Sequence, residues 1–373
     1  MNAKHWLEKI HSLSLSRDIS IMNVCGGHER TLSAAGLRSI LPQHIHLIPG
    51  PGCPVCVCPE QVIQFAINLS EEDNVILTSF GDMLRVPTSK GKKSLNSLLQ
   101  SRALGNQVIP IVSPLEVLNL AKQNPTQTIV FFVAGFETTL APVVSLMEQG
   151  VPDNVKFLIA ARKTWPIVKF LLDSPANRLD ALIAPGHVAS VMGGAEWNFI
   201  SETYQTPCAI AGFNESSLLA AIYSVCRQYS EQQPFLDNCY PTVVNETGNQ
   251  TAQHLMNKYF SVYNADWRGI GQVESSGFRL KPSYDHWNAE VYFNQLFAAM
   301  EAEQSQKKQD MPLGCDCDQV VLGKILPTEC RLFGKACTPA KPVGPCMVSD
   351  EGACHIWSTT GVCINKPEAI YAS

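Results

Sequence analysis

Two short stretches near the N-terminus concentrate cysteine with glycine, histidine and glutamate. The first, CGGHE, begins at Cys25, and the second, GPGCPVC, contains Cys53 and Cys56. At the CxxC spacing two thiols can form a disulfide, lower each other's pKa or bind a soft metal. Two glycines beside Cys25 leave its thiol open to a closely approaching ligand. His28 could donate to, protonate or ligate a group there, or be a satisfied loop histidine. These loops therefore predict a metal site, a thiol–disulfide pair, or both.

A second concentration of thiols lies near the C-terminus, where seven of the 14 cysteines fall between 315 and 363. The paired CxxC knuckles typical of zinc do not occur in that stretch, and its spacings are irregular. Four thiolates that converge on an iron–sulfur cube tolerate such spacing. The stretch therefore favours an iron–sulfur centre over zinc or no metal. Spacing does not fix which four cysteines ligate. Cys208, Cys226 and Cys239, between the two groups, are expected to be small buried side chains.

Composition limits the class of protein. The 373 residues carry a formal net charge of -5, and no basic stripe indicates a nucleic-acid partner. No apolar run reaches the roughly 20 residues that a membrane-spanning helix needs. The N-terminus lacks the continuous apolar core of a signal peptide, so we expect a cytoplasmic protein. Clustered cysteines in a reducing compartment more often bind metals or do redox work than form structural disulfides.

Short apolar strands alternate with helices over the first 235 residues, a pattern that predicts parallel sheets covered by helices. The expected strands are 19–24, 44–49, 74–80, 107–113, 128–135, 155–161, 181–185 and 208–213. The expected helices are 30–40, 59–69, 94–103, 114–123, 138–149, 165–173 and 216–231. Beyond 235 we expect a helix, an irregular or short-stranded segment, a helix over 288–309 and a Cys-rich end.

The expected architecture is α/β, with two parallel-sheet lobes that face a cleft and a C-terminal Cys-rich domain. The expected ranges are 1–125, 126–234 and 235–373. Polar, glycine-marked segments follow several of the strands, and they contain Cys25, Cys53, Cys56, Asp82, Glu137 and His187. In parallel sheets the functional cleft forms beyond the carboxyl ends of the strands. Any one segment could simply be a strand-to-helix turn, but the set predicts one shared cleft.

A series of motifs resembles the HypD family of [NiFe]-hydrogenase maturation proteins. In chain order they are CGGHE (25–29), GPGCPVC (50–56), FGDMLRVP (80–87), GFETT (135–139), PGHV (185–188), WRGIG (267–271), ESSG (274–277), CRLFGKACTP (330–339) and MVSDEGAC (347–354). The resemblance implies two α/β lobes and a C-terminal domain with a [4Fe-4S] cluster. It also implies a scaffold, rather than a conventional turnover enzyme, on which an Fe(CN)2CO unit is assembled with the chaperone HypC. Cyanide would come from HypE, which HypF supplies, and the unit would pass to the hydrogenase large subunit.

The resemblance also implies roles for individual residues. Cys25 would be the iron-binding thiolate, shared with a cysteine of HypC, and His28 would support it. Cys53 and Cys56 would be the redox pair that faces the iron. The rest of the cleft would be lined by Asp82, Glu137, Thr138 and His187. The cluster pattern best fits Cys317, Cys330, Cys337 and Cys354, with Cys346 in reserve and with Cys315 and Cys363 as additional thiols.

The chain departs from the family pattern at a few positions. Arg30 stands where the family often has a second histidine, and Cys58 lies where it usually has no thiol, so CPVCVC could form an alternative disulfide. CDQV (317–320) replaces the usual CGEV. Two other classes of function stay open: an iron–sulfur-dependent thiol–disulfide oxidoreductase that uses Cys53 and Cys56, and a zinc-stabilised α/β binding protein.

Overall fold

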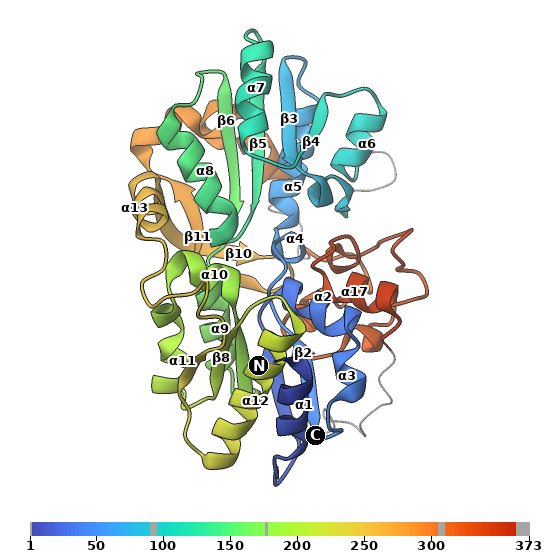
Figure 1. Ribbon diagram of the computed structural model, residues 1–373. Helices are drawn as coiled ribbons and strands as arrows, with labels where there is room; N and C mark the ends of the chain where they lie inside the picture. Colours follow the sequence, from blue (N-terminus) through green and yellow to red (C-terminus); the bar gives the residue numbers. More distant parts are fainter. Residues whose placement is uncertain (1, 90–94, 176–177, 305–309, 363–373) are drawn as a thin grey trace.

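The computed structural model describes residues 2–89, 95–175, 178–304 and 310–362. Within these ranges the chain forms two parallel sheets, one above the other in Figure 1. The lower sheet has the order β2-β1-β7-β8-β9 and the upper sheet the order β4-β3-β5-β6. The strands are β1 (Ile19–Asn23), β2 (Ile45–Pro49), β3 (Val75–Phe80), β4 (Val108–Ile111), β5 (Thr128–Gly135), β6 (Val155–Ala161), β7 (Ala181–Pro185), β8 (Cys208–Ala211), β9 (Leu236–Asn238), β10 (Phe260–Trp267) and β11 (Gly271–Leu280).

Helices flank both sheets. They are α1 (Ala3–His11), α2 (Gly26–Ala34), α3 (Leu37–Ile40), α4 (Pro54–Val57), α5 (Glu60–Ser70), α6 (Leu98–Ala103), α7 (Leu115–Gln123), α8 (Glu137–Gln149), α9 (Thr164–Leu172), α10 (Gly186–Met192), α11 (Asn198–Glu202), α12 (Glu215–Glu231), α13 (Gln250–Tyr259), α14 (Ala289–Tyr292), α15 (Asn294–Gln304), α16 (Cys317–Val321) and α17 (Ala353–Thr360). The 3-10 turns are η1 (Gly81–Arg85), η2 (Gly194–Trp197), η3 (Pro282–Trp287), η4 (Pro327–Glu329) and η5 (Pro345–Met347). Among the described residues, no helix combines the length and the apolar character that crossing a membrane requires.

The predicted α/β class is confirmed, and so are all eight predicted strands, each to within two residues at either end. The central strands are apolar and almost wholly buried, as strands covered by helices on both faces must be. The helix expected over 30–40 is two helices, because Gly36 adopts a left-handed conformation (φ 61°) between α2 and α3. The sequence reading missed the short strand β9.

The chain passes between the two sheets more often than expected. Strands β1 and β2 belong to the lower sheet, β3 to β6 form the upper one, and β7 to β9 return to the lower one. The division expected between 125 and 126 therefore falls inside the upper sheet, between β4 and β5. Each sheet forms by pairing distant strands: β1, for example, lies between β2 and β7 in parallel register. Turn signals along the chain do not reveal such long-range pairing.

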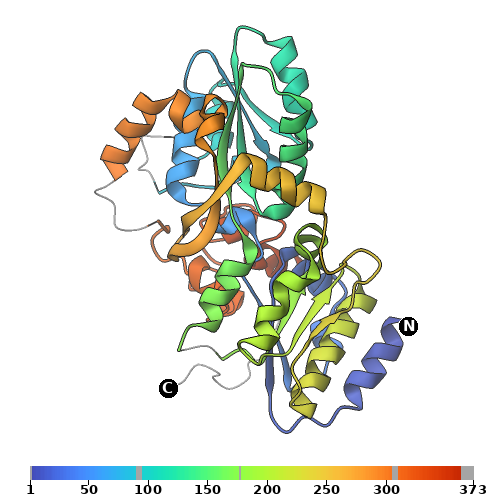
Figure 2. The same cartoon turned by 90° about the vertical axis from the view of Figure 1, so that its left-hand side faces the viewer.

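The region beyond 235 has two parts. Helix α13 packs against α8, and the antiparallel hairpin β10–β11 continues beside β6 along the upper lobe (Figure 2). Residues 310–362, here called the Cys-rich segment, contain only α16, α17 and short 3-10 turns. This segment lies beside α2, where the two lobes meet (Figure 1). The helix expected over 288–309 is observed as α14 and α15, and 305–309 lie outside the described residues.

Candidate metal and thiol-redox site

The two cysteine loops predicted near the N-terminus lie side by side because they follow neighbouring strands. We call residues 24–29 and 50–58 the front loops. They leave β1 and β2 at the paired positions Asn23 and Pro49. The N–H of Gly26 donates to the carbonyl of Gly52 across a donor–acceptor distance of 3.2 Å. Parallel pairing therefore places Cys25 next to the CPVC turn, at the carboxyl edge of the sheet.

The glycines of CGGH permit close packing from two directions. A Cβ on Gly26 would collide with the backbone of Glu351 in the Cys-rich segment. A Cβ on Gly27 would come within 2.7 Å of the Phe213 ring, which follows β8. Neither glycine has a positive φ. These positions are glycine because other parts of the chain occupy the space that a side chain would need. The sequence alone predicts a different reason for the glycines, which is access of a ligand to Cys25.

Cys53 and Cys56 form a disulfide with an S–S distance of 2.05 Å. Cys53 precedes the short helix α4, and its Sγ accepts the backbone N–H of Cys56 at 3.2 Å. Cys58 is a free, buried thiol, and burial raises its pKa to about 12. In this structure the alternative disulfide through Cys58 is therefore not formed.

A small cavity joins the front loops to the Cys-rich segment. Cys25, Cys53 and Cys56 line it from one side, and Cys346 and Glu351 line it from the other. The Cys25 side chain is half-buried, whereas the other three cysteines are buried. The cavity therefore collects an accessible thiol, a disulfide and a member of the C-terminal cysteine group around one space.

The surroundings of Cys25, burial first and the charge of Glu351 second, keep its sulfur protonated. Burial raises the pKa of the Cys25 thiol to about 12, and the nearby Glu351 carboxyl adds to the rise, although the backbone N–H groups of His28 and Gly27 oppose it. Cys25 immediately precedes α2, but this helix terminus does not outweigh desolvation. Burial also raises the pKa of Glu351, to about 7. The cavity therefore holds a neutral thiol beside a carboxyl group that titrates near neutrality.

His28 is fully buried and faces the lower lobe. Its Nε2 is 3.0 Å from the carbonyl oxygen of Ala211, so Nε2 carries the proton and donates it. Its Nδ1 has no hydrogen-bond partner among the described residues. Burial lowers the pKa of His28 to about 4, so the ring is neutral near pH 7. The ring packs on that of Phe213. The Phe213 ring in turn stacks on the His187 ring, with 3.7 Å between the two ring centroids.

Glu29 connects the front loops to the Cys-rich segment. Its buried carboxylate accepts hydrogen bonds from Trp357 Nε1 (2.6 Å), Arg38 Nη2 (2.7 Å), Asn23 Nδ2 (3.0 Å) and Ser33 Oγ (3.2 Å). Burial alone would raise the pKa of Glu29, but Arg38 and the other donors hold it below its usual value. Arg38 also lies over the Trp357 ring, 5.1 Å from the centroid. Trp357 of α17 thus contacts both members of the buried ion pair between Glu29 on α2 and Arg38 on α3.

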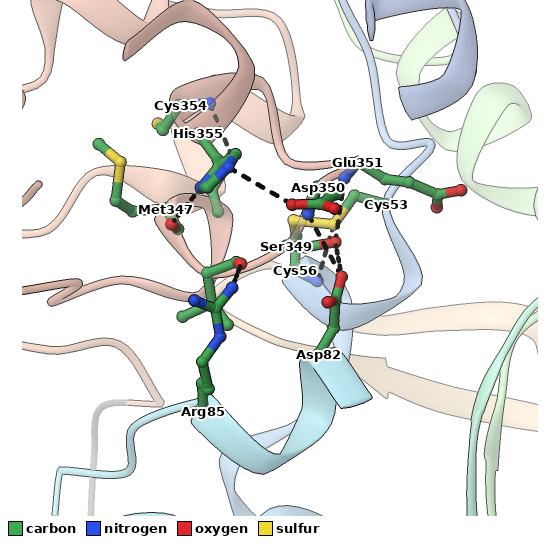
Figure 3. Close-up of a disulfide and its surroundings, with 12 residues drawn as sticks. Cys53, Cys56, Asp82, Arg85, Met347, Ser349, Asp350, Glu351, Cys354 and His355 are labelled. Carbon is green, nitrogen blue, oxygen red and sulfur yellow. Dashed lines mark hydrogen bonds and ion pairs between the residues drawn. A yellow bond between two sulfur atoms is a disulfide. The ribbon is translucent and has the colours of Figure 1, made fainter. Parts of the chain in front are cut away.

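Asp82 lies at the other side of the Cys-rich segment. Figure 3 shows its carboxylate at the turn of the Cys-rich segment, where it accepts from Ser349 Oγ at 3.0 Å and from the backbone N–H of Asp350 at 3.2 Å. Arg85 Nη2 donates to the carbonyl of Val348 at 2.6 Å. The FGDMLR motif of the upper lobe thus binds the turn that carries Glu351 into the cavity.

The other predicted cleft residues take different positions. The exposed His187 ring reaches the site indirectly, through Phe213. Glu137 is fully buried at the start of α8 and accepts from the N–H (2.7 Å) and Oγ1 (2.6 Å) of Thr164. Burial raises its pKa despite these bonds. The half-buried Thr138 follows it, and neither residue lines the cavity between the thiols.

The Cys-rich segment gathers its thiols in one place. The Sγ atoms of Cys317, Cys346 and Cys354 lie within 4.8 Å of one another, and all three residues are buried. Cys330 and Cys337 each interact electrostatically with both Cys315 and Cys317 but stand outside this triad. The Cys337 Sγ accepts the N–H of Val343 at 3.3 Å. The reserve candidate Cys346 is therefore a member of the triad, and Cys363 lies outside the described residues.

This donor set fits a soft metal. The triad offers three buried sulfur ligands with no competing carboxylate, and Cys330 or Cys337 could supply a fourth. The Cys346 Sγ also accepts the backbone N–H of Cys354 at 3.4 Å, the kind of contact that stabilises a ligating thiolate. Thiolate sets of this kind hold both zinc and iron–sulfur clusters.

Sequence reasoning missed several residues that shape the site. Glu29 and Glu351 lie inside the motifs CGGHE and MVSDEGAC, but the motifs alone do not indicate a role for either carboxyl group. The Trp357 side chain had no recognisable signal, because its partner is 328 residues away in the chain. Arg30, at the departure from the family pattern, is exposed and lies 3.9 Å from the Asp350 carboxylate.

The fold and the site together define a two-lobed α/β protein with a disulfide and a buried cysteine triad that fits a soft metal at the lobe junction. The sequence model of HypD, described as the "Hydrogenase formation hypA family", matches residues 1–361. The chain is 37% identical over 360 residues to the hydrogenase maturation factor HypD of Escherichia coli, covering 95% of this chain and 93% of that protein. It is also 37% identical over 359 residues to a putative hydrogenase expression/formation protein of Methanocaldococcus jannaschii, covering 95% and 96%. The chain belongs to the HypD family of hydrogenase maturation factors.

Proposed function

We propose that this protein is a scaffold on which the Fe(CN)2CO unit of [NiFe]-hydrogenase is assembled. The observation that carries the proposal is the cavity lined by Cys25, Cys53, Cys56 and Cys346. An iron that carries cyanide and carbonyl is soft, and thiolate is an appropriate anchor for it. In this scheme iron is the cargo, Cys25 is its anchor, and the disulfide stands beside it.

The residues around Cys25 would manage the proton that its thiol loses when iron binds. The thiol is neutral at pH 7, because burial and Glu351 raise its pKa to about 12. Glu351 itself has a pKa of about 7, so it can accept that proton within the cavity. The N–H groups of Gly27 and His28 face the sulfur and would stabilise the thiolate once it forms. His28 contributes by fixing the loop against Ala211.

The disulfide and the Cys-rich segment would supply redox chemistry. When two electrons enter the Cys53–Cys56 disulfide, its S–S bond breaks and two thiols form with the uptake of two protons. We assign the triad Cys317, Cys346 and Cys354 to a [4Fe-4S] cluster, with Cys330 or Cys337 as the fourth ligand. When bound, such a cluster supplies electrons at low potential. Cys346 belongs to both the triad and the cavity wall, which supports electron passage between them.

The partners follow from the same scheme. A HypC-like chaperone would add a second cysteine ligand to the iron at the half-buried Cys25, and HypE, supplied by HypF, would deliver cyanide. The completed unit would move to the hydrogenase large subunit. A cytoplasmic location fits this exchange, because a reducing compartment keeps the free thiols available.

Infrared spectroscopy on the anaerobically purified complex with HypC tests the proposal. We expect cyanide and carbonyl stretching bands in the parent protein and none in Cys25→Ala. The matched control is Cys226→Ala, which removes a buried thiol in the core of the lower lobe and should keep the bands. Their absence from iron-loaded parent protein would refute the scaffold.

The formed disulfide favours one alternative, an iron–sulfur-dependent thiol–disulfide oxidoreductase. That function needs Cys53 and Cys56 and does not need Cys25. Steady reduction of a disulfide substrate by Cys25→Ala at the parental rate, without infrared bands in the parent, would establish the oxidoreductase in place of the scaffold.

A further inference from the structure

The CGGH loop, which carries Cys25, is pressed between two other parts of the chain. On one side the backbone of Glu351 fills the space that a Cβ on Gly26 would need. On the other side a Cβ on Gly27 would lie 2.7 Å from the ring of Phe213. The contact with Glu351 joins the loop to the Cys-rich segment, and the scaffold mechanism uses that carboxyl group. The contact with Phe213 joins the loop to the lower lobe, and the scaffold mechanism does not use it.

The Phe213 side chain is itself held by several neighbours. Its half-buried ring stacks on the His187 ring, with 3.7 Å between the centroids and 25° between the planes. The centroid of the His28 ring lies 4.8 Å from that of Phe213. The carbonyl oxygen of Phe213 accepts a hydrogen bond from Thr31 Oγ1 at 3.2 Å. The ring is therefore not free to turn away from the loop.

The backbone on either side of Phe213 is fixed as well. A Cβ on Gly212 would lie 2.8 Å from the Tyr240 ring, so the backbone packs directly on that ring. The N–H of Gly212 donates to Ser217 Oγ at 2.7 Å. Asn214 caps α12, because its Oδ1 accepts the N–H of Ser217 at 2.9 Å. The turn between β8 and α12 thus forms a rigid support beneath the CGGH loop.

The point where the ring touches the loop is also next to the sulfur. A Cβ on Gly27 would lie 3.6 Å from the Cys25 Sγ. The backbone N–H groups of Gly27 and His28 interact with the same sulfur. A side chain that fixes Gly27 therefore fixes the sulfur and the two donors around it.

We propose that Phe213 is the positioning residue of the Cys25 anchor, because its ring holds Gly27 so that the sulfur and its two N–H donors keep one arrangement. This role follows from the packing alone, and its use in holding iron rests on the proposed function. Phe213 acts through Gly27 and not as a ligand. It also restricts access to Cys25, because its ring covers one side of the loop that carries the half-buried thiol.

The first test measures how fast iodoacetamide labels Cys25 in the full chain, purified alone and without reductant. Trypsin releases residues 18–30 as a peptide in which Cys25 is the only cysteine, so mass spectrometry reports this thiol by itself. We expect Phe213→Leu to label about tenfold faster than the parent at pH 8, the factor that corresponds to about 1.4 kcal/mol less free energy for opening the loop. An unchanged or slower rate would overturn the proposal.

The matched control is Phe199→Leu. It removes another partly buried ring of the lower lobe, one that packs on the rings of Trp165 and Tyr204. This variant should label Cys25 at the parental rate, and an equal acceleration in both variants would contradict a specific role for Phe213. The tryptic peptide 179–227 contains only two cysteines, the buried Cys208 and Cys226, and should stay unlabelled as long as the lobe is folded.

A double-mutant cycle with Gly27→Ala tests the contact itself. In the parent the new Cβ meets a stacked ring, so we expect faster labelling of Cys25 while peptide 179–227 stays unlabelled. In Phe213→Leu the branched side chain can rotate away, so adding Gly27→Ala should change the rate by less than about twofold. Effects that simply multiply would mean that ring and loop are independent, and the proposal would be wrong. If Phe213→Leu opens the whole lobe, Gly27→Ala decides alone, and a parental rate in that variant refutes the contact.

A second readout is the infrared spectrum of the complex with HypC. We expect the cyanide and carbonyl bands of Phe213→Leu to be broader than those of the parent, because the anchor no longer keeps one arrangement. The bands of Phe199→Leu should match the parent. Parental band widths in Phe213→Leu would show that the iron site does not depend on the ring, which would overturn the role of Phe213 in the anchor. A parent without bands would contradict the scaffold and leave the labelling result intact.

Discussion

The front loops and the Cys-rich segment hold their sulfur atoms by different means. In the front loops, parallel pairing of β1 with β2 places Cys25 beside the Cys53–Cys56 turn. In the Cys-rich segment short helices and turns carry the cysteines, and contacts with other parts of the chain hold them. The first site is fixed by backbone hydrogen bonds. The second depends on packing and, in our proposal, on a metal, as small metal domains commonly do.

Removing a triad thiol should have the largest effect on metal content and stability, because a metal ligand is lost. It tests whether the Cys-rich segment needs its metal. We expect Cys346→Ser to lose iron and sulfide to background and to lower the unfolding temperature of the anaerobic protein. Elemental analysis and calorimetry measure both. Cys226→Ser is the control for removal of a buried thiol. Full iron content in Cys346→Ser would exclude this residue as a ligand, and the same assay on Cys330→Ser and Cys337→Ser would identify the fourth ligand.

The two regions also differ in how much of them sequence could predict. The strands before the front loops are continuous apolar runs, so their positions, and with them the placement of Cys25, Cys53 and Asp82 after strands, could be read from periodicity. The pairing of β1 with β7 could not, because turn signals describe only local chain direction. The sequence also could not show which cysteines of the Cys-rich segment come together. Its irregular spacing left Cys346 in reserve, although folding places the Cys346 Sγ within 4.8 Å of those of Cys317 and Cys354.

A substitution at the contact between the two regions should show how closely they are joined. In Gly26→Ala the new Cβ would meet the backbone of Glu351, which cannot move without shifting the Cys-rich segment. We expect a loss of about 1–3 kcal/mol in the free energy of unfolding, as for overpacked cores. We also expect faster alkylation of Cys25. Gly81→Ala is the matched control, because no atom lies within 4 Å of a Cβ there. Equal behaviour of the two variants would argue against the close contact.

The hydrogen bond between Trp357 and Glu29 joins the regions through side chains. Trp357→Phe keeps a ring beneath Arg38 but removes the Nε1 donor from a buried carboxylate. We expect a loss of about 1 kcal/mol in the free energy of unfolding at pH 7, since Glu29 retains three other donors. The control is Trp197→Phe. The Trp197 side chain is also fully buried, but its Nε1 has no partner among the described residues. If both variants lose the same stability, ring size and not the hydrogen bond is responsible.

The pH dependence of the stability lost in Trp357→Phe, compared with that lost in Trp197→Phe, should be the smallest effect and the most specific. The ordinary pKa of a glutamate is about 4.3, and the folded-state pKa of Glu29 is lower than this. The ionised form of Glu29 therefore stabilises the fold above the ordinary pKa. This stabilisation disappears as the pH falls through the folded-state pKa. Trp357 donates to the ionised carboxylate, so Trp357→Phe should raise the pKa of Glu29 and shift acid unfolding to higher pH. Denaturant titrations between pH 7 and pH 3 should therefore show the deficit of Trp357→Phe shrinking with acid, while that of Trp197→Phe stays constant. A deficit that does not change with pH would mean that α17 is held by apolar packing alone, and that the charge on Glu29 does not join the front loops to the Cys-rich segment.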